Sequence, residues 1–429
     1  MPSLTDRSGG TLEHGRRPDV RVAQLQHNRR RRYGRPVNPD RIALQDWKVA
    51  AAETSLLEAI SAVSTVEARH VAAWRKHASA DVVAAAIDVV RARRSAADRL
   101  EDAETLIADA DGAQQATPAI LARWKAQRIA AAAPGAMVVD CGCGIGADTR
   151  MLAQVSDVSA IERSVARAWM AQCYSGVAVS TETTTDYNAV EGVLHLDPGR
   201  RDDAGARLRD PTLWSPGLEA LQSIWTAQRD ACIMLGPGVH LDECALPEDV
   251  QVSFCSIDRT LTDAAAWSGT LALHKGQLEA VGLSSDGVVR LLHGHPGVPP
   301  GGPPPAAGLV LHVPDPALER ARLLDQIAEA HDLWEPATGL GLLLGRVAAD
   351  DAWLQPWTIE GVASPREDAM AAWLNDHDGG TVTVRTRGAA TSDADALSRR
   401  LSGRGSTPWT VWILRLGRQK TALMTSQTG

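Results

Sequence analysis

Helical periodicity dominates the first part of the chain. Between residues 42 and 111, apolar residues recur at intervals of three and four, as in Leu56, Leu57, Ile60 and Val63, and proline is absent. This spacing places apolar side chains on one face of an α-helix. The pattern predicts several helices packed as a small bundle, which we assign to a helical domain over residues 41–133.

From residue 134 onward, short apolar runs alternate with segments of helical periodicity. This alternation is typical of an α/β domain with a largely parallel sheet. We expect five strands at residues 136–140, 158–161, 177–180, 192–197 and 231–235, and a last antiparallel pair at 251–257 and 270–274. The pattern therefore predicts a Rossmann-like seven-stranded α/β sheet over residues 134–276.

The remainder of the chain reads as two smaller α+β units. A proline-rich segment at 293–308 interrupts regular structure, and a helix at 318–331 and a buried strand at 340–344 follow, so residues 277–360 form a linker and a small domain. In residues 361–429, Val382 and Val384 alternate with threonines and arginines, which indicates a strand with one apolar and one basic face.

Composition and charge narrow the class of protein. The chain has 429 residues and a net charge of −8, so any contact with a polyanion requires a local basic patch. Residues 1–40 carry basic runs, including Arg29 to Arg32, and read as a disordered arm. Such an arm is either a nucleic-acid tether, a solvated tail, or the product of a misassigned start codon.

Cysteine usage and hydropathy indicate the compartment. The six cysteines form no C-x-x-C pair, and Cys141 and Cys143 read as small residues of a tight loop, so we expect no metal site. No apolar run of about 20 residues and no signal peptide is present. We expect a reduced, cytoplasmic protein with no membrane partner.

A glycine-rich turn follows the first predicted strand. In VVDCGCGIGADT, Asp140 ends the strand, and Gly142, Gly144 and Gly146 follow at alternate positions. Such glycines let the backbone approach a nucleotide at the start of the next helix. The spacing differs from the G-x-G-x-x-G of dinucleotide-binding enzymes, which disfavours a nicotinamide oxidoreductase. It resembles motif I of class I S-adenosylmethionine (SAM) dependent methyltransferases.

Two further acids fall where such folds hold their cofactor. Glu162 ends the second strand, 22 residues after Asp140, where a carboxylate accepts ribose hydroxyls; its alternative is a solvated surface acid. Asp186 precedes the fourth strand, in the loop where the methyltransferase resemblance implies an acid that binds the adenine amino group. By this order along the chain, both acids are predicted to bind SAM.

The segment Q-A-T-P before motif I adds a second point of resemblance. Thr117 reads as the N-cap and Pro118 as the first residue of a helix. With A-R-W-K-A-x-R and motif I, the segment is similar to the entry of trimethylguanosine synthase-like methyltransferases, and closer to bacterial methyltransferases that end in a THUMP-like domain. The resemblance implies that Gln115 and Thr117 border the SAM pocket; otherwise the segment is a well-capped packing helix.

The fourth strand leads into Asp197-Pro198-Gly199-Arg200-Arg201, at the position of motif IV. Amino-methyltransferases acting on nucleobases carry D-P-P-Y or S-P-P-W there, in which the acid and the proline carbonyl orient the amine. Here Asp197 and Pro198 match, whereas Gly199 and Arg200 replace the second proline and the aromatic residue. The D-P-x-R-R variant resembles the THUMP-like-domain proteins, and the departure weakens the expectation of base stacking.

The two arginines of this block suit phosphate or carboxylate recognition, so we predict that Arg200 and Arg201 bind substrate. The alternative is structural salt bridges with the acids Asp202, Asp203 and Asp210.

The C-terminal pattern TVTVRTRG, a helix and WTVWILRLG resembles the THUMP-like domain. Because THUMP domains occur in RNA-modifying enzymes, the resemblance implies that Arg385 and Arg387, with Arg415 and Arg418, touch RNA phosphates. The alternative is that they are ordinary solvent-facing arginines.

These observations predict a class I methyltransferase fold with an N-terminal helical domain and C-terminal small α+β (THUMP-like) domains. The predicted function is SAM-dependent methyl transfer to RNA, with a nitrogen acceptor and no metal. The alternative is a catalytically inactive SAM-fold protein that serves as an RNA- or protein-binding module. The sequence does not predict the oligomeric state.

Overall fold

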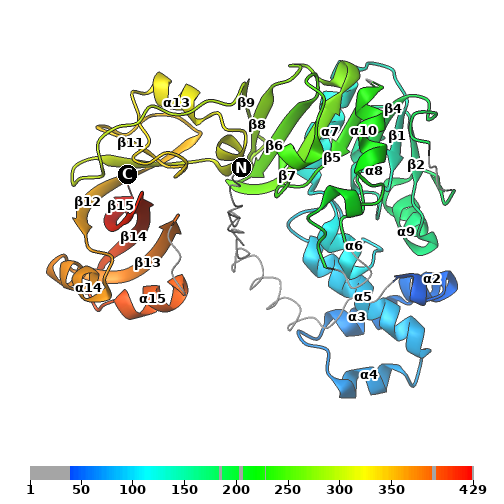
Figure 1. The fold of residues 1–429 in the computed structure, drawn as a ribbon. Helices are drawn as coiled ribbons and strands as arrows, with labels where there is room; N and C mark the ends of the chain where they lie inside the picture. Colours follow the sequence, from blue (N-terminus) through cyan, green and yellow to red (C-terminus); the bar gives the residue numbers. More distant parts are fainter. Residues whose placement is uncertain (1–38, 183–185, 202–205, 228, 389–392, 428–429) are drawn as a thin grey trace, which may run out of the picture. The chain divides into compact units, whose positions relative to one another are not determined.

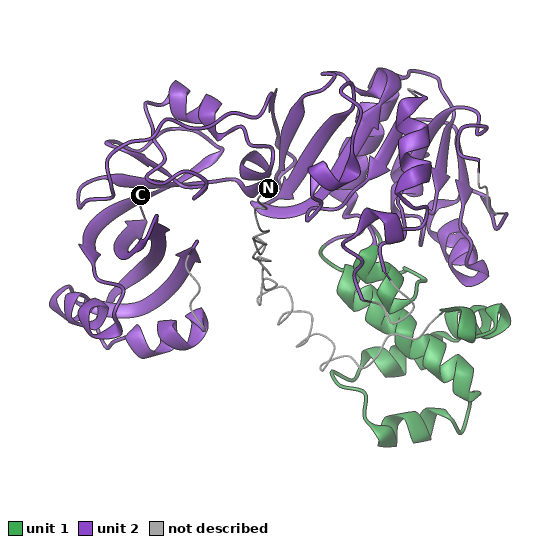
Figure 2. Ribbon diagram, viewed as in Figure 1, with its two compact units in different colours: residues 1–98, 102–115 green, residues 99–101, 116–429 purple. Residues whose placement is uncertain are grey.

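The computed structural model describes residues 39–182, 186–201, 206–227, 229–388 and 393–427. The chain forms two compact units (Figure 2), the first comprising residues 1–98 and 102–115 and the second residues 99–101 and 116–429. The predicted basic arm lies outside the described residues, apart from its last two positions.

The first unit is helical, as predicted, but it ends at Gln115 and not at the predicted boundary of residue 133. Its helices are α2 (Leu44–Ala52), α3 (Thr54–Ser61), α4 (Ala68–Trp74), α5 (Ala80–Ala96) and α6 (Ala110–Gln115). The long helix α5 packs against α2, α3 and α6 through a face of buried valine and alanine residues. Trp47 is fully buried and donates its indole N–H to the Pro39 carbonyl. Helical periodicity was therefore sufficient to predict this core.

One carboxyl group is buried in this helical core. Asp88 of α5 has no exposed surface, and its Oδ2 accepts a hydrogen bond from the Ala110 backbone at 3.1 Å. Its Oδ1 is buried without a partner among the described residues. Burial raises the pKa of Asp88 to about 7, and the neighbouring charge of Asp109 acts in the same direction.

We expect Asp88→Asn to stabilise the helical unit at pH 8. A carboxyl pKa that is higher in the folded state favours folding at low pH, and this advantage is lost as pH rises from about 4 to 7. The shift corresponds to a penalty on the order of 4 kcal/mol above pH 7, which asparagine does not incur. Hydrogen exchange of the α5 amides measures it. Asp81→Asn, at an exposed position of α5, is the control and should leave the pH dependence intact.

The second unit contains a nine-stranded sheet in the order β3-β2-β1-β4-β5-β7-β6-β8-β9 (Figure 1). Its strands are β1 (Val138–Cys141), β2 (Val158–Ile161), β3 (Val179–Ser180), β4 (Val193–Leu196), β5 (Ala231–Met234), β6 (Gln251–Ile257), β7 (Thr260–Ser268), β8 (Leu278–Leu283) and β9 (Val289–Gly294). The first five strands are parallel, as predicted.

Two layers of helices cover this sheet. Helix α7 (Ala119–Ala132) packs with Val138 on one face, and α10 (Leu218–Thr226) packs with Val139 on the other. Alternate residues of β1 thus point into separate cores, as expected for a strand buried on both sides. The other helices between these strands are α8 (Ala147–Leu152), α9 (Val165–Ser175) and α11 (Leu241–Cys244).

The predicted seven-stranded sheet is corrected at its far edge. Residues 270–274 are not a strand; β7 comes earlier, directly after β6, and β8 and β9 continue the same sheet beyond the predicted end at residue 276. The β6–β7 turn uses Asp258 and Arg259 with φ of 45° and 60°. Such left-handed pairs normally contain asparagine or glycine, so the sequence lacked the usual hairpin signal.

The C-terminal part forms one six-stranded sheet in the order β11-β10-β12-β15-β14-β13. Its strands are β10 (Val310–Pro314), β11 (Leu343–Gly345), β12 (Leu354–Ala363), β13 (Gly379–Arg387), β14 (Thr407–Leu416) and β15 (Gln419–Gln427). The two predicted small domains, 277–360 and 361–429, share this sheet because β12 crosses the boundary between them.

Helices α14 (Glu367–Asp376) and α15 (Ala394–Leu401) pack with Val382 and Val384 on one face of this sheet. The predicted alternation of β13 is confirmed, since these two valines are buried while Thr381, Thr383 and Arg385 are exposed.

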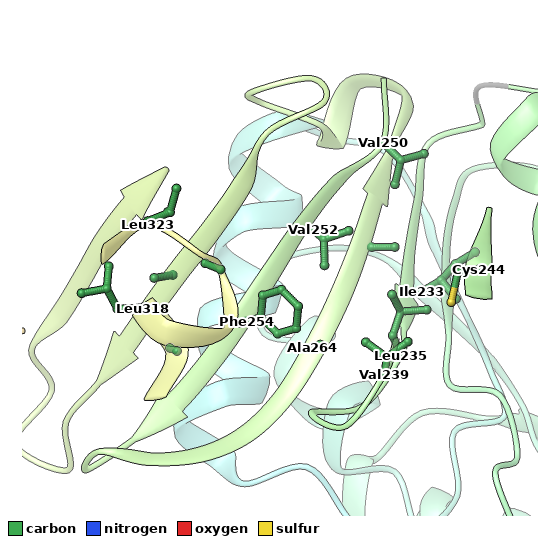
Figure 3. Close-up of a cluster of buried hydrophobic side chains, with 14 of the residues drawn as sticks. Ile233, Leu235, Val239, Cys244, Val250, Val252, Phe254, Ala264, Leu318 and Leu323 are labelled. Atoms are coloured by element: carbon green, nitrogen blue, oxygen red, sulfur yellow. The ribbon is translucent and has the colours of Figure 1, made fainter. Parts of the chain in front are cut away.

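The predicted helix at 318–331 is two helices, α12 (Pro316–Arg320) and α13 (Leu324–Ala330). Arg322 between them has φ of 56°, a left-handed conformation that ends the first helix. Leu318 and Leu323 pack with Phe254 of β6 in one buried cluster (Figure 3), so this connection seals an apolar face of the nine-stranded sheet.

Candidate active site

The glycine turn between β1 and α8 is built to approach other chain segments closely. Gly142, Gly144 and Gly146 all have positive φ, at 80°, 59° and 85°, which side chains rarely adopt. A Cβ on Gly142 would lie 3.1 Å from the Asp197 carbonyl oxygen, and one on Gly146 would lie 3.0 Å from that of Ala171. A Cβ on Gly144 would meet nothing within 4 Å.

The turn is thus pressed against the protein at its first and third glycines and faces open space at the second. That shape fits a cofactor laid across the loop, because backbone N–H groups can approach it there without a side chain between.

Asp140 lies below this turn and is 1% exposed. Its Oδ2 accepts a hydrogen bond from Thr149 Oγ1 at 2.5 Å, and its Oδ1 accepts one from His195 Nδ1 at 2.8 Å. Thr149 is in α8 and His195 is in β4. Asp140 therefore connects both ends of the glycine turn to the neighbouring strand β4. Its predicted role in cofactor binding would then be to hold the glycine turn in position.

The same network continues into helix α7 through a buried lysine. Lys125 Nζ lies 3.3 Å from His195 Nε2 and 2.6 Å from Asp148 Oδ1, and it is 1% exposed. Because Nδ1 of His195 donates to Asp140, Nε2 is available to accept from the ammonium group. Burial acts to lower the pKa of Lys125, but the charge of Asp148 outweighs it and the pKa is raised.

Asp148 shows the complementary change. Burial acts to raise its pKa, but Lys125 and the hydrogen bond from Thr117 Oγ1 at 2.6 Å lower it below the ordinary value. The result is a buried ion pair with its hydrogen bonds made, as such a pair requires.

Thr117 therefore does not act as the predicted helix N-cap. Pro118 occupies that position, without a side-chain capping bond, and the threonine hydroxyl donates to Asp148 instead. Gln115 belongs to the first unit, where its side-chain amide donates to the Asp111 carbonyl oxygen at 3.3 Å. Thr117 is thus connected to α8, the helix that follows motif I, through Asp148.

Glu162 is directly connected to the glycine turn. Its Oε2 accepts a hydrogen bond from the Gly144 backbone at 3.0 Å, and its Oε1 accepts one from Ser164 at 2.9 Å. The side chain is 8% exposed, and burial raises the pKa of its carboxyl group. The structure therefore places Glu162 beside the glycine turn, and its contact with the ribose stays a prediction.

We expect Glu162→Ala to weaken SAM binding by about tenfold or more. The substitution removes the acceptor for the Gly144 N–H and the proposed ribose acceptor together, each worth about 1–1.5 kcal/mol. Calorimetry with SAM measures the dissociation constant. Glu182→Ala, at an exposed position, is a control for lost charge, and an unchanged affinity in Glu162→Ala would exclude the ribose role.

Asp186 is exposed and organises its own turn. Its Oδ1 accepts hydrogen bonds from the backbones of Asn188 at 3.1 Å and Ala189 at 3.3 Å. The preceding residues 183–185 lie outside the described residues. The adenine contact remains a prediction from position along the chain.

The motif IV block begins beside the glycine turn. The Asp197 backbone N–H donates to the Cys141 carbonyl oxygen at 3.3 Å, and its own carbonyl lies against Gly142. The neighbouring Gly199 pairs with Ser215 through hydrogen bonds of 2.7 and 3.0 Å. Asp197 and Pro198 are therefore held next to the loop predicted to carry the cofactor.

The structure shows which acid pairs with Arg200 of the motif IV block. Arg200 Nη2 donates to Asp197 Oδ1 at 3.1 Å, so its acidic partner is within the motif. Asp210 accepts from the backbone of Thr212 at 2.9 Å. Asp202 and Asp203 lie outside the described residues, and Arg201 is exposed.

Two C-terminal arginines predicted to contact RNA have partners within the protein. Arg387 Nη1 lies 3.0 Å from Glu319 Oε1 of α12. The guanidinium group of Arg385 lies 5.3 Å from the ring centroid of Trp412 and 6.0 Å from that of Trp357, within cation–π range. A contact between either arginine and RNA stays a prediction.

The cysteines of the turn are unsuited to nucleophilic chemistry. Burial and the charge of Asp140 raise the pKa of Cys141 to about 12 and also raise that of Cys143. In the described parts of the chain, no group of three or more histidines, cysteines or acids could hold a metal ion. No helix there is long and apolar enough to cross a membrane.

Sequence reasoning missed Lys125, His195, Asp148 and Thr149. The available signals were a lysine within the apolar face of a helix and a histidine inside the apolar strand VLHL. Their pairing brings together residues 70 positions apart along the chain, which no local pattern reveals.

Comparison with known proteins supports the class of SAM-dependent methyltransferases. The chain is 28% identical over 314 residues to a protein of Mycobacterium tuberculosis named as an uncharacterized SAM-dependent methyltransferase, in each of two strains. The match covers 71% of this chain and 83% of the relative. No family model matches.

A crystal structure of a candidate methyltransferase from Porphyromonas gingivalis W83 has the same fold. It superposes with a TM-score of 0.67 at 14% identity and covers 90% of this chain and 98% of its own. Fold and relatives together support a SAM-dependent methyltransferase, an enzyme whose cofactor is SAM.

Proposed function

We propose that this protein transfers the methyl group of SAM to a nitrogen atom of RNA. The observation that carries the proposal is the contact between the glycine turn and Asp197 at the carboxyl end of β4. Ligands of open α/β sheets bind at the carboxyl ends of the strands, and an acid held there can meet both cofactor and acceptor.

The cofactor site comprises the glycine turn and the acid at the end of β2. Gly142, Gly144 and Gly146 present the backbone, and Glu162 accepts the ribose hydroxyls. Asp186 binds the adenine amino group, and Thr117 borders the pocket. SAM, when bound, supplies a methyl group on a positively charged sulfur.

Asp197 acts on the acceptor. Its carboxylate accepts a hydrogen bond from the acceptor N–H, which aims the nitrogen lone pair at the methyl group, and it takes up the proton that the nitrogen loses. The Pro198 carbonyl supplies a second acceptor for an exocyclic amine. Arg200 fixes the carboxylate by its 3.1 Å hydrogen bond, so the orientation is set before the acceptor arrives.

RNA is the favoured acceptor because arginines, rather than an aromatic residue, flank the site. Arg200 and Arg201 suit a phosphate, and the C-terminal strand β13 adds Arg385 and Arg387. The resemblance of residues 361–429 to THUMP-like domains supports the same substrate class.

Incubation with tritiated SAM tests the proposal, with total RNA and total protein from the same cells as separate acceptors. We expect label in RNA. Label confined to protein would overturn the RNA assignment. SAM binding without label in either pool would instead support a binding module that retains the fold, which the Gly199-Arg200 departure favours.

A further inference from the structure

A second arginine approaches the motif IV block from the opposite arm of its loop. Residues 199–201 and 207–215 run antiparallel, with pairs Gly199–Ser215 and Arg201–Arg207. The Leu208 N–H also donates to the Arg200 carbonyl at 2.8 Å. Arg200 and Arg207 therefore project from two paired arms beside Asp197.

Both guanidinium groups converge on one glycine at the end of β5. Gly236 has φ of 76°, and a Cβ there would overlap Arg200 Nη1 and lie 2.8 Å from Arg207 Nη2. The absent side chain lets two cationic groups occupy the same corner, next to the carboxyl end of β4. Strands β4 and β5 are hydrogen-bonded neighbours, so this corner adjoins Asp197.

The charges at this corner favour an anion. Arg200 uses Nη2 to bind Asp197, while its Nη1 is buried without a partner among the described residues. Partial burial of the guanidinium group lowers the pKa of Arg207, and the positive charges of Arg200 and Arg201 act in the same direction, against the opposing charge of the buried Asp263. The guanidinium groups of Arg200, Arg201 and Arg207 thus outnumber the carboxylates of Asp197 and Asp263, and a bound anion would offset the remaining positive charge.

We propose that Arg200 and Arg207 form a phosphate-binding site over Gly236 that holds a backbone phosphodiester of the RNA acceptor beside Asp197. This inference rests on the proposed function. It gives a binding role to Arg207, which lies outside the motif IV block. Guanidinium groups bind phosphate oxygens by paired hydrogen bonds. Two of them therefore fix the position of the RNA strand without recognising its base sequence.

The test compares Arg207→Gln with Arg209→Gln, using a short single-stranded RNA and fluorescence anisotropy at several salt concentrations. Arg209 is exposed on the same arm, so both variants lose the same charge from the same segment. We expect Arg207→Gln to bind RNA about tenfold more weakly. The slope of log affinity against log salt should fall by about 0.7, the value for one phosphate contact on a single strand. Arg209→Gln should remain near wild type, and SAM affinity should be equal in all three proteins.

Equal RNA affinity and equal salt slope in the two variants would overturn the inference. If the wild-type protein still methylates RNA in that case, the proposed function is unaffected. Absence of RNA binding and RNA methylation in the wild type would overturn both.

Discussion

Replacing Lys125 by methionine is expected to destabilise the sheet-containing unit by about 3–5 kcal/mol at pH 8, the cost of leaving one partner of a buried ion pair alone. Methionine fits the space of the lysine stem, so the loss comes from the ammonium group. Asp148 would keep the hydrogen bond from Thr117 but no cation. Urea unfolding followed by tryptophan fluorescence measures the change.

The pH dependence identifies the cause. In the wild type the pKa of Asp148 is lowered, so the stability from this carboxylate is present above the unfolded pKa and lost as pH falls through the folded value. In Lys125→Met the lowering effect of the lysine charge is lost and burial raises the pKa of Asp148, so the deficit should shrink as pH falls from 8 to 5. Lys125→Met combined with Asp148→Asn should recover at least half of the lost stability. A deficit that is independent of pH and additive in the double variant would contradict the ion-pair account.

Asp197→Asn is expected to lower the rate of methyl transfer to RNA by about 10²–10³-fold, within the range for loss of a positioned proton acceptor. Asparagine keeps an oxygen that can accept from Arg200 Nη2, so the loop geometry is preserved. SAM affinity should change by less than about twofold, because the proposed role of this carboxylate is toward the acceptor and not toward the cofactor. Single-turnover transfer from labelled SAM measures the rate.

Asp210→Asn is the matched control for this variant. Asp210 lies on the same loop, is exposed, and accepts from Thr212, which asparagine also allows. It should transfer methyl groups at the wild-type rate. A rate for Asp197→Asn within about threefold of wild type would remove Asp197 from the reaction.

The parts of the fold that local pattern predicts are those in which short apolar runs end at glycine or an acid. Strand β1, its glycine turn and the acid at the end of β2 follow from such runs, because a strand buried on both faces needs continuous β-branched residues. The alternation of apolar and polar residues along β13 likewise follows from its one buried and one exposed face. All of these features depend on residues that are close together in the sequence.

The features that pattern could not predict depend on distant residues. The hairpin between β6 and β7 turns on Asp258 and Arg259, and the strand β12 belongs to a sheet whose other members lie on both sides of a predicted domain boundary. Lys125 lies on the apolar face of its helix, but its pairing with Asp148 and His195 is seen only in the structure. The convergence of Arg207 on Gly236 likewise requires the paired arms of the loop.

The most direct test of the account uses SAM with a deuterated methyl group and RNA from the source cells. After digestion, mass spectrometry of the nucleosides is expected to find the deuterated methyl group on a base nitrogen with wild-type protein, and to find far less with Asp197→Asn. A digest in which no nucleoside carries the deuterated group, from protein that binds SAM, would contradict the assignment of this chain as an RNA methyltransferase.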